Sequence, residues 1–175
     1  ASSRHVCRYL DIPIQHSHPD VLRAMHRADT VKAVPAMAER IRRIIPGVTL
    51  RTTCLVGFPG ETEEHFRHLM DFIAEARFEH LGAFAFSPEE GTPAFDMGDD
   101  PDDVVAERRR KELMKAQAKI ARKILRGRKG QTVRILLEEP PEADGEMWEG
   151  RTEWQAPDDI DGMERDKATL ERRCA

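Results

Sequence analysis

The hydrophobic positions of the chain follow two alternating periods, and together they predict an α/β fold. Runs rich in apolar and β-branched residues predict strands at 9–14, 50–56 and 81–86. Apolar residues that recur every three or four positions predict helices at 19–27, 32–45 and 63–76, and a long one from the acidic stretch 99–103 to about Arg126. Strands that alternate with helices favour parallel pairing with right-handed crossovers.

The helix at 63–76 carries the clearest of these patterns. Its apolar positions have the spacing i, i+3, i+4 and i+7, which predicts one face packed on the sheet: Phe66, Leu69, Met70 and Ile73. Thr62 is a natural N-cap, and acidic residues at 63 and 64 suit the positive end of the helix.

The second predicted strand, 50–56, leads into a turn that contains Gly57, Pro59 and Gly60. Glycine adopts positive φ easily and lets a ligand approach bare backbone, so the turn and the following helix start form a candidate ligand site. The alternative is a tight turn that needs glycine only for its shape. The sequence alone leaves both readings open.

Polar residues follow all three predicted strands, at Gln15–Ser17, Gly57–Glu61 and Ser87–Glu90. Parallel strands end at a common edge, where α/β folds bind their ligands. We therefore expect the three clusters to share one rim. The first strand, 9–14, is expected to be an open edge of the sheet.

The pattern changes after Arg126. Residues 127–130 resemble a linker, strands are predicted at 131–137 and 147–154 around a turn at 140–145, and residues 164–175 are highly charged. We expect domains at 1–126 and 127–163, the second a small β domain, and an atypical tail at 164–175 that is helical or disordered.

Charge divides at the same boundary. Residues 101–130 hold eleven Lys or Arg against four Asp or Glu, whereas residues 131–163 hold two against ten. The basic helix is either a phosphate contact or an ordinary solvated face. The acidic segment suits a basic protein partner better than a nucleic acid.

Composition adds few constraints. Of all residues 39% are hydrophobic and 34% are charged, and no signal peptide or membrane-length apolar run is present, so we expect a cytoplasmic protein without a membrane partner. Three widely separated cysteines, Cys7, Cys54 and Cys174, argue against a disulfide framework or a self-contained cysteine metal site. The uncapped start at Ala1 suggests a piece of something longer.

Several single residues have two readings. His16 is either a proton shuttle or a cap for the next helix, and Asp11 either has a basic partner or lies on an exposed edge. Glu61 and Glu89 are candidates for an acid–base pair, although the sequence does not fix their separation. Cys54 alternates with Leu55 and is expected in the core.

Three long stretches resemble the radical-SAM methylthiotransferases: Tyr9-Leu-Asp-Ile-Pro-Ile-Gln-His16, Arg51-Thr-Thr-Cys-Leu-Val-Gly-Phe-Pro-Gly-Glu-Thr62 and Phe86-Ser-Pro-Glu-Glu-Gly-Thr-Pro-Ala94. The first is similar to the RimO type, which modifies an aspartate of protein 12 of the small ribosomal subunit. The segment after Arg126 resembles the TRAM module, including Gly150-Arg-Thr152, Ala156-Pro157 and Ile160-Asp-Gly162.

This resemblance implies the last three strands of a partial six-stranded TIM-like barrel, followed by a truncated TRAM β-barrel. It implies S-adenosylmethionine across the strand ends, and the positions that match the family's cofactor-binding motifs are Gln15, His16, Leu55, Gly57, Gly60, Phe86, Ser87 and Pro88. It identifies no catalytic residue and no metal ligand in this chain.

The intact family proteins carry two 4Fe–4S clusters, and the C-x-x-x-C-x-x-C loop that holds the radical-generating one is absent from this sequence. We therefore expect the chain alone to be inactive. The implied partner is the ribosomal protein, with ribosome or RNA contacts through the TRAM segment. Three alternatives stay open: a tRNA methylthiotransferase of the MiaB type, a non-catalytic RNA- or protein-binding module, and an unrelated phosphate-binding barrel enzyme that uses the Gly57–Thr62 turn.

Overall fold

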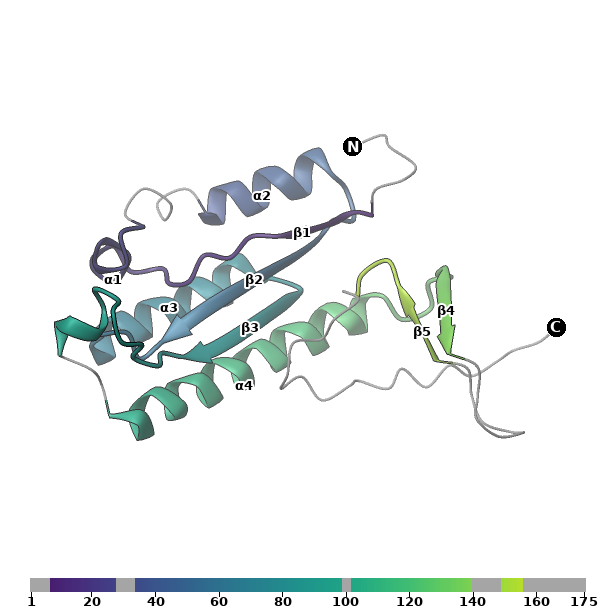
Figure 1. The fold of residues 1–175 in the computed structure, drawn as a ribbon. Coiled ribbons are helices and arrows are strands. Elements are labelled where there is room, and N and C mark those ends of the chain that lie inside the picture. The colour runs from purple at the N-terminus through teal and green to yellow at the C-terminus, as the bar shows by residue number, and fades with distance from the viewer. Residues whose placement is uncertain (1–6, 28–33, 99–101, 140–148, 156–175) are drawn as a thin grey trace.

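A three-stranded parallel sheet forms the centre of the computed structural model, which describes residues 7–27, 34–98, 102–139 and 149–155. The strands β1 (Tyr9–Asp11), β2 (Thr49–Val56) and β3 (His80–Ala85) are arranged in the order β1-β2-β3 (Figure 1). Both pairings are parallel, with Asp11 opposite Arg51 and Arg51 opposite His80. The predicted α/β class is confirmed, and β1 lies at an edge as expected.

The helices agree with the predicted ones in order, and their bounds differ slightly. They are α1 (Pro19–Ala24), α2 (Val34–Ile44), α3 (Glu63–Ala76) and α4 (Asp103–Gly127), with a short 3-10 helix, η1 (Phe95–Met97), before α4. α1 ends before the predicted Arg27 because His26 has a positive φ of 54°. Gly127 continues α4 instead of starting a linker.

β1 is shorter than the predicted strand 9–14, because Pro13 has no N–H to donate to the sheet. The chain nevertheless stays beside β2. The Ile12 N–H donates to the Arg51 carbonyl at 2.9 Å, and Gln15 forms an isolated parallel bridge with Cys54. Gln15 is therefore held at the end of the sheet although it lies outside a continuous strand.

The hydrophobic core lies between one face of the sheet and the helices α2, α3 and α4. It combines alternate residues of the strands with the apolar faces of the helices, including Leu50, Cys54, Val56, Leu69, Ile73, Leu81 and Leu113, all of them buried. The predicted stripe of α3 is confirmed, with Phe66, Leu69 and Ile73 buried and Met70 partly buried. Residues of the other face are more exposed, such as Thr53, Leu55 and Phe84.

A second, two-stranded antiparallel sheet follows α4. It consists of β4 (Ile135–Glu139) and β5 (Glu149–Thr152), which replace the predicted strands 131–137 and 147–154. Figure 1 shows α4 running beside β3 and continuing past the start of that strand toward β4 and β5. The predicted turn at 140–145 and tail at 164–175 lie outside the described residues, as do Ala156-Pro157 and Ile160-Asp-Gly162.

Trp154 attaches the second sheet to the first. Its carbonyl oxygen lies 2.7 Å from His80 Nε2, and the Arg128 guanidinium stacks over its ring at 3.9 Å from the ring centre. In the part of the chain that the structure describes, no helix combines the length and the apolar composition needed to cross a membrane.

Candidate functional site

The carboxyl ends of the three strands meet at one rim of the parallel sheet. The Leu55 N–H donates to the Gln15 carbonyl at 2.7 Å, and the Phe86 N–H donates to the Val56 carbonyl at 2.8 Å. Gly57 follows Val56 directly and is buried. The predicted shared rim is thus present, and it brings together Gln15, Leu55, Gly57 and Phe86.

The remaining predicted positions lie around this rim. Gly60, Ser87 and Pro88 are exposed, whereas Gln15, Leu55 and Phe86 are half-buried. The Phe86 ring meets the buried Phe58 ring edge to face, with ring centres 5.2 Å apart. The rim therefore combines apolar rings and side chains with open backbone, and cofactor binding by these residues stays a prediction.

The two glycines of the turn have different reasons to be glycine. Both have positive φ, 76° at Gly57 and 78° at Gly60. A Cβ atom on Gly57 would lie 2.4 Å from the Ala106 Cβ, whereas a Cβ atom on Gly60 would meet nothing within 4 Å. Gly57 is thus required by the close approach of α4, and Gly60 is the one that leaves backbone open at the rim.

The buried side chain of Glu61 stabilises this turn. Its side chain is fully buried, and Oε2 accepts hydrogen bonds from the N–H groups of Gly57 and Phe58. Glu89, its predicted acid–base partner, lies in an exposed loop. The geometry therefore assigns Glu61 to the backbone of the turn, and it gives the proposed carboxylate pair no support.

Two further buried residues surround the Glu61 carboxylate. Arg109 of α4 donates from Nη1 to the Glu61 carbonyl at 3.0 Å and lies 3.5 Å from Oε1. His16 Nε2 lies 3.7 Å from the same Oε1. No sequence pattern singles out Arg109, because it lies 48 positions from Glu61 in a helix that contains many basic residues.

His16 is completely buried, so its ring does not face the open side of the rim. Its Nδ1 accepts a hydrogen bond from the His18 N–H at 3.0 Å. The N-cap of α1 is His18 itself, whose side chain accepts from the Asp20 N–H. The His16 ring is therefore neither a cap of α1 nor exposed at the rim as a proton shuttle would be. It supports the segment between β1 and α1.

A cluster of histidines, which the sequence did not predict, lies beside this segment. The His18 and His65 rings stack with centres 4.1 Å apart, and the His68 ring meets His18 edge-on at 5.1 Å. Burial lowers the pKa of His18, and the neighbouring His65 and His68 lower it further.

A metal ion is a conceivable occupant of this cluster, because donor atoms of His18, Asp20 and His65 lie within 4.8 Å of one another. However, His18 Nδ1 accepts the Asp20 N–H, and His65 Nδ1 accepts the Thr62 N–H. A ring that accepts at Nδ1 carries its proton on Nε2 and has no free lone pair. The cluster is thus arranged to cap α1 and α3.

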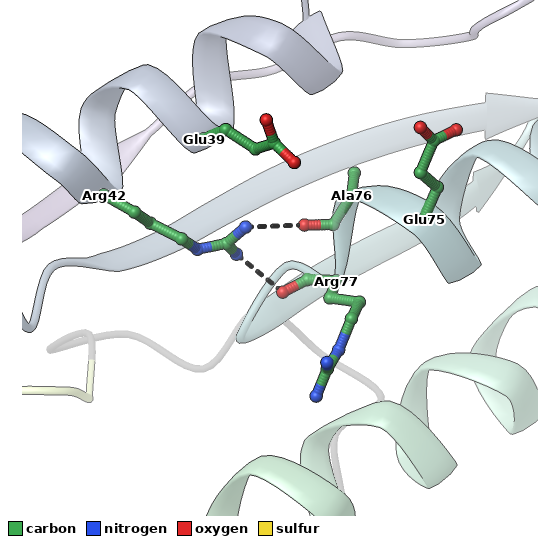
Figure 2. A pocket seen from close by; sticks show the side chains of 5 residues that line it. All are labelled: Glu39, Arg42, Glu75, Ala76 and Arg77. Atoms are coloured by element: carbon green, nitrogen blue, oxygen red, sulfur yellow. Dashed lines mark hydrogen bonds between the residues drawn. The ribbon is translucent and has the colours of Figure 1, made fainter.

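A pocket of about 370 Å³ lies elsewhere, at the carboxyl end of α3 (Figure 2). Arg42 donates from Nη1 to the Ala76 carbonyl at 2.8 Å and from Nη2 to the Arg77 carbonyl at 2.7 Å. These bonds satisfy carbonyl groups at the end of α3, which ends in a left-handed Arg77. The pocket is explained by helix capping.

Comparison with known proteins finds similarity in the part of the chain that contains the rim. Residues 2–73 match the family model of the Radical SAM superfamily. A protein of Microcystis aeruginosa named ribosomal protein uS12 methylthiotransferase RimO is 45% identical over 159 residues, which are 91% of this chain and 36% of the relative. Proteins of the same name from Synechococcus sp. RCC307 and Desulfitobacterium hafniense are 46% and 43% identical, over 94% and 90% of the chain and 33% and 35% of the relatives.

The chain is a homologue of the RimO-type radical-SAM methylthiotransferases. It spans about a third of the length of the curated relatives it matches. The three parallel strands and their helices are consistent with part of a radical-SAM domain. The match to the Radical SAM superfamily implies S-adenosylmethionine and an iron–sulfur cluster in the intact protein.

Proposed function

We propose that residues 1–126 form the last three strands of a radical-SAM barrel, in an enzyme that adds a methylthio group to an aspartate of ribosomal protein uS12. The observation that carries this proposal is the shared rim, where Gln15, Leu55, Gly57 and Phe86 meet. The names of the relatives support uS12 as the substrate over a tRNA.

The rim residues fit S-adenosylmethionine in chemical character. Leu55 and Phe86 offer partly buried apolar surface for an adenine ring, Gln15 offers an amide, and Gly60 leaves backbone free. The full proposed set is Gln15, His16, Leu55, Gly57, Gly60, Phe86, Ser87 and Pro88, with His16 acting only through its backbone because its ring is buried. When bound beside a reduced cluster, S-adenosylmethionine supplies the radical chemistry of the family.

The cluster ligands are proposed to come from another part of the intact enzyme. This sequence contains no C-x-x-x-C-x-x-C, and Cys54 is buried in the core. The role of this chain is then to bind and orient the cofactor and to exclude water beneath the turn. We propose that alone it does not complete the reaction.

Residues 127–163 are proposed to belong to a TRAM-type β-barrel. The antiparallel pairing of β4 and β5 and their attachment through Trp154 support this assignment. The resemblance of Gly150-Arg-Thr152 to the TRAM module also supports the assignment, and these residues form most of β5.

A chimeric enzyme tests the proposed function. The segment of the Microcystis aeruginosa relative that aligns with this chain is replaced by this chain, and the uS12 produced with it is examined by mass spectrometry. We expect a methylthio group on uS12. A matched chimera with Gly60→Asn adds a side chain at the open backbone of the rim with a residue type that tolerates positive φ. It is expected to bind S-adenosylmethionine more weakly while still folding and carrying its clusters.

Two results would contradict the proposal. A folded chimera with both clusters that modifies tRNA and leaves uS12 unmodified favours the MiaB-type alternative. A folded chimera that fails to bind S-adenosylmethionine would show that the rim is not the cofactor site. It would favour a different ligand for the Gly57–Thr62 turn.

A further inference from the structure

One segment of this acidic chain carries charge of a single sign. Residues 113–137 contain eight Lys or Arg and no Asp or Glu, although the net charge of the whole chain is −4. The segment covers the second half of α4, the turn after it and the start of β4. Its charge is therefore a local property that needs its own explanation.

The two halves of α4 treat their basic residues differently. In the first half Arg108 pairs with Glu63 and Glu112, and Arg110 and Lys111 both pair with Glu107. In the second half five exposed side chains form no ion pair with any residue that the structure describes: Lys115, Lys119, Arg122, Lys123 and Arg126. We call these five residues the basic stripe.

The basic stripe lies along one side of the helix. Its spacing of four, three, one and three residues keeps the five side chains within a narrow sector, since each residue turns the helix by about 100°. Leu113 and Gln117, on the opposite side, are buried against the sheet domain. The stripe extends over about 16 Å, at 1.5 Å per residue, and faces away from the core.

The helix dipole does not account for the stripe. Basic residues are favoured near a carboxyl terminus, but this effect is confined to about the last turn. Lys115 and Lys119 lie well before the end of α4 at Gly127. Unpaired like charges at this spacing repel one another, so the isolated chain gains no stability from them.

We propose that the basic stripe binds the phosphate backbone of structured RNA. Lysine and arginine aligned along a helix, without intervening acidic groups, match the regular negative charge of a nucleic acid. Surface Lys is depleted at protein–protein interfaces, which favour aromatic residues, and residues 113–137 contain no Phe, Trp or Tyr. A membrane-surface helix needs a free apolar face, and Leu125 is the one exposed large hydrophobic residue in the second half of α4, where Leu113, Met114 and Ile120 pack on the core.

The mode of binding follows from the residue types. Lysine ammonium groups contact phosphates as point charges, and Arg122 and Arg126 are the only residues of the stripe that can also read a base edge. Binding is therefore expected to depend strongly on salt and weakly on sequence. The acidic residues that follow from Glu138 do not interrupt the stripe, since they begin after it in the chain. This inference is independent of the chemistry proposed at the rim.

The test uses the 175-residue chain and a fluorescent RNA hairpin, with binding measured between 50 and 200 mM salt. One triple variant removes stripe charges (Lys119→Gln, Arg122→Gln and Arg126→Gln), and a matched one removes paired charges (Arg108→Gln, Arg110→Gln and Lys111→Gln). Both lose the same residue types and the same net charge. Circular dichroism checks that both variants are folded.

We expect the stripe variant to bind about tenfold more weakly or worse at 100 mM salt, and the slope of log K against log salt to fall in magnitude by about 2. The paired variant is expected to stay within about twofold of the wild-type chain. On the wild-type chain, RNA is expected to shift the amide NMR signals of residues 115–126 more than those of 103–111, which needs no variant.

Three outcomes would overturn the proposal. The first is that both triple variants weaken binding equally, which indicates a general charge effect. The second is that the wild-type chain does not bind the hairpin at 50 mM salt. The third is that phosphatidylserine vesicles bind with the same dependence on the stripe and RNA does not, which assigns the stripe to a membrane.

Discussion

Arg109 Nη1 donates a 3.0 Å hydrogen bond to the Glu61 carbonyl and lies 3.5 Å from the carboxylate of the same residue. Both side chains are almost completely buried. One residue of α4 therefore contacts both the backbone and the side chain of the residue that holds the β2–α3 turn. The β2–α3 turn thus depends on a residue that lies 48 positions later in the chain than Glu61.

Replacing Arg109 with Met is expected to lower the free energy of unfolding by about 3–5 kcal/mol, because it leaves a buried carboxylate without its cation. Urea denaturation followed by circular dichroism measures the change. Arg108→Met is the control, since Arg108 pairs with Glu63 and Glu112 at the surface and exposed pairs contribute about 0–1 kcal/mol. Equal losses in the two variants would contradict a special role for the buried pair.

Gly57→Ala and Gly60→Ala form a second matched pair. Both introduce a side chain at positive φ, which costs roughly 1 kcal/mol, but only the first also brings a Cβ atom to 2.4 Å from Ala106 Cβ. Overpacking adds about 1–3 kcal/mol, so Gly57→Ala is expected to be the less stable variant by that amount in thermal or urea denaturation. The double variant Gly57→Ala, Ala106→Gly should recover part of the loss, and no recovery would point to backbone strain as the main cause.

The histidine caps predict a dependence of stability on pH. The pKa of His18 is lowered from its ordinary value of 6.5, first by burial and then by His65 and His68. The folded state therefore binds fewer protons than the unfolded state below about pH 6.5. The contribution of His18 is fully present above that pH and is lost as the pH falls through its folded pKa, when Nδ1 also stops accepting the Asp20 N–H.

His18→Asn tests this dependence, since Asn is a good N-cap that does not titrate. We expect the variant to lose less stability than the wild-type chain between pH 7 and pH 5, as measured by urea denaturation at each pH. The other histidines are the same in both proteins, so the difference between the two curves isolates His18. Parallel curves would show that the cap does not titrate in this range.

The cysteines should differ sharply in reactivity. Cys54 is fully buried, and burial raises the pKa of its thiol far above the usual range, whereas Cys7 is exposed. Iodoacetamide at pH 8 is expected to alkylate Cys7 in the native chain and Cys54 only after denaturation, because the thiolate is the reactive form. Mass spectrometry of the separated peptides distinguishes the sites, and rapid native labelling of Cys54 would contradict the packing of β2.

Local patterns were sufficient to predict much of the fold. The stripe of α3, its Thr62 cap and the inward side of Cys54 each follow from residues close together in the sequence, and all three are confirmed. The common rim was also predictable, because parallel strands place their carboxyl ends at the same edge. The short β1 was harder to predict, since Pro13 interrupts the strand while Gln15 rejoins the sheet.

Residues that act through long-range contacts were not predictable in the same way. Arg109 is one basic residue among many in α4, and only the packing of that helix against Gly57 brings it to Glu61. The histidine cluster joins residues from the starts of two helices. His16 was assigned to the rim by its position in the chain, and its ring lies buried beneath it.

The length of α4 determines how the second sheet is rotated about the helix axis relative to the first. The helix runs without interruption from Asp103 to Gly127, about 37 Å at 1.5 Å per residue. It contacts Gly57 near its start, and Arg128, just after its end, stacks on Trp154. One residue inserted at mid-helix would rotate everything beyond it by about 100° and displace β4 and β5 sideways, whereas seven residues would restore the orientation almost fully and move them outward. Insertions close to a whole number of helical turns should therefore be tolerated better than insertions of other lengths.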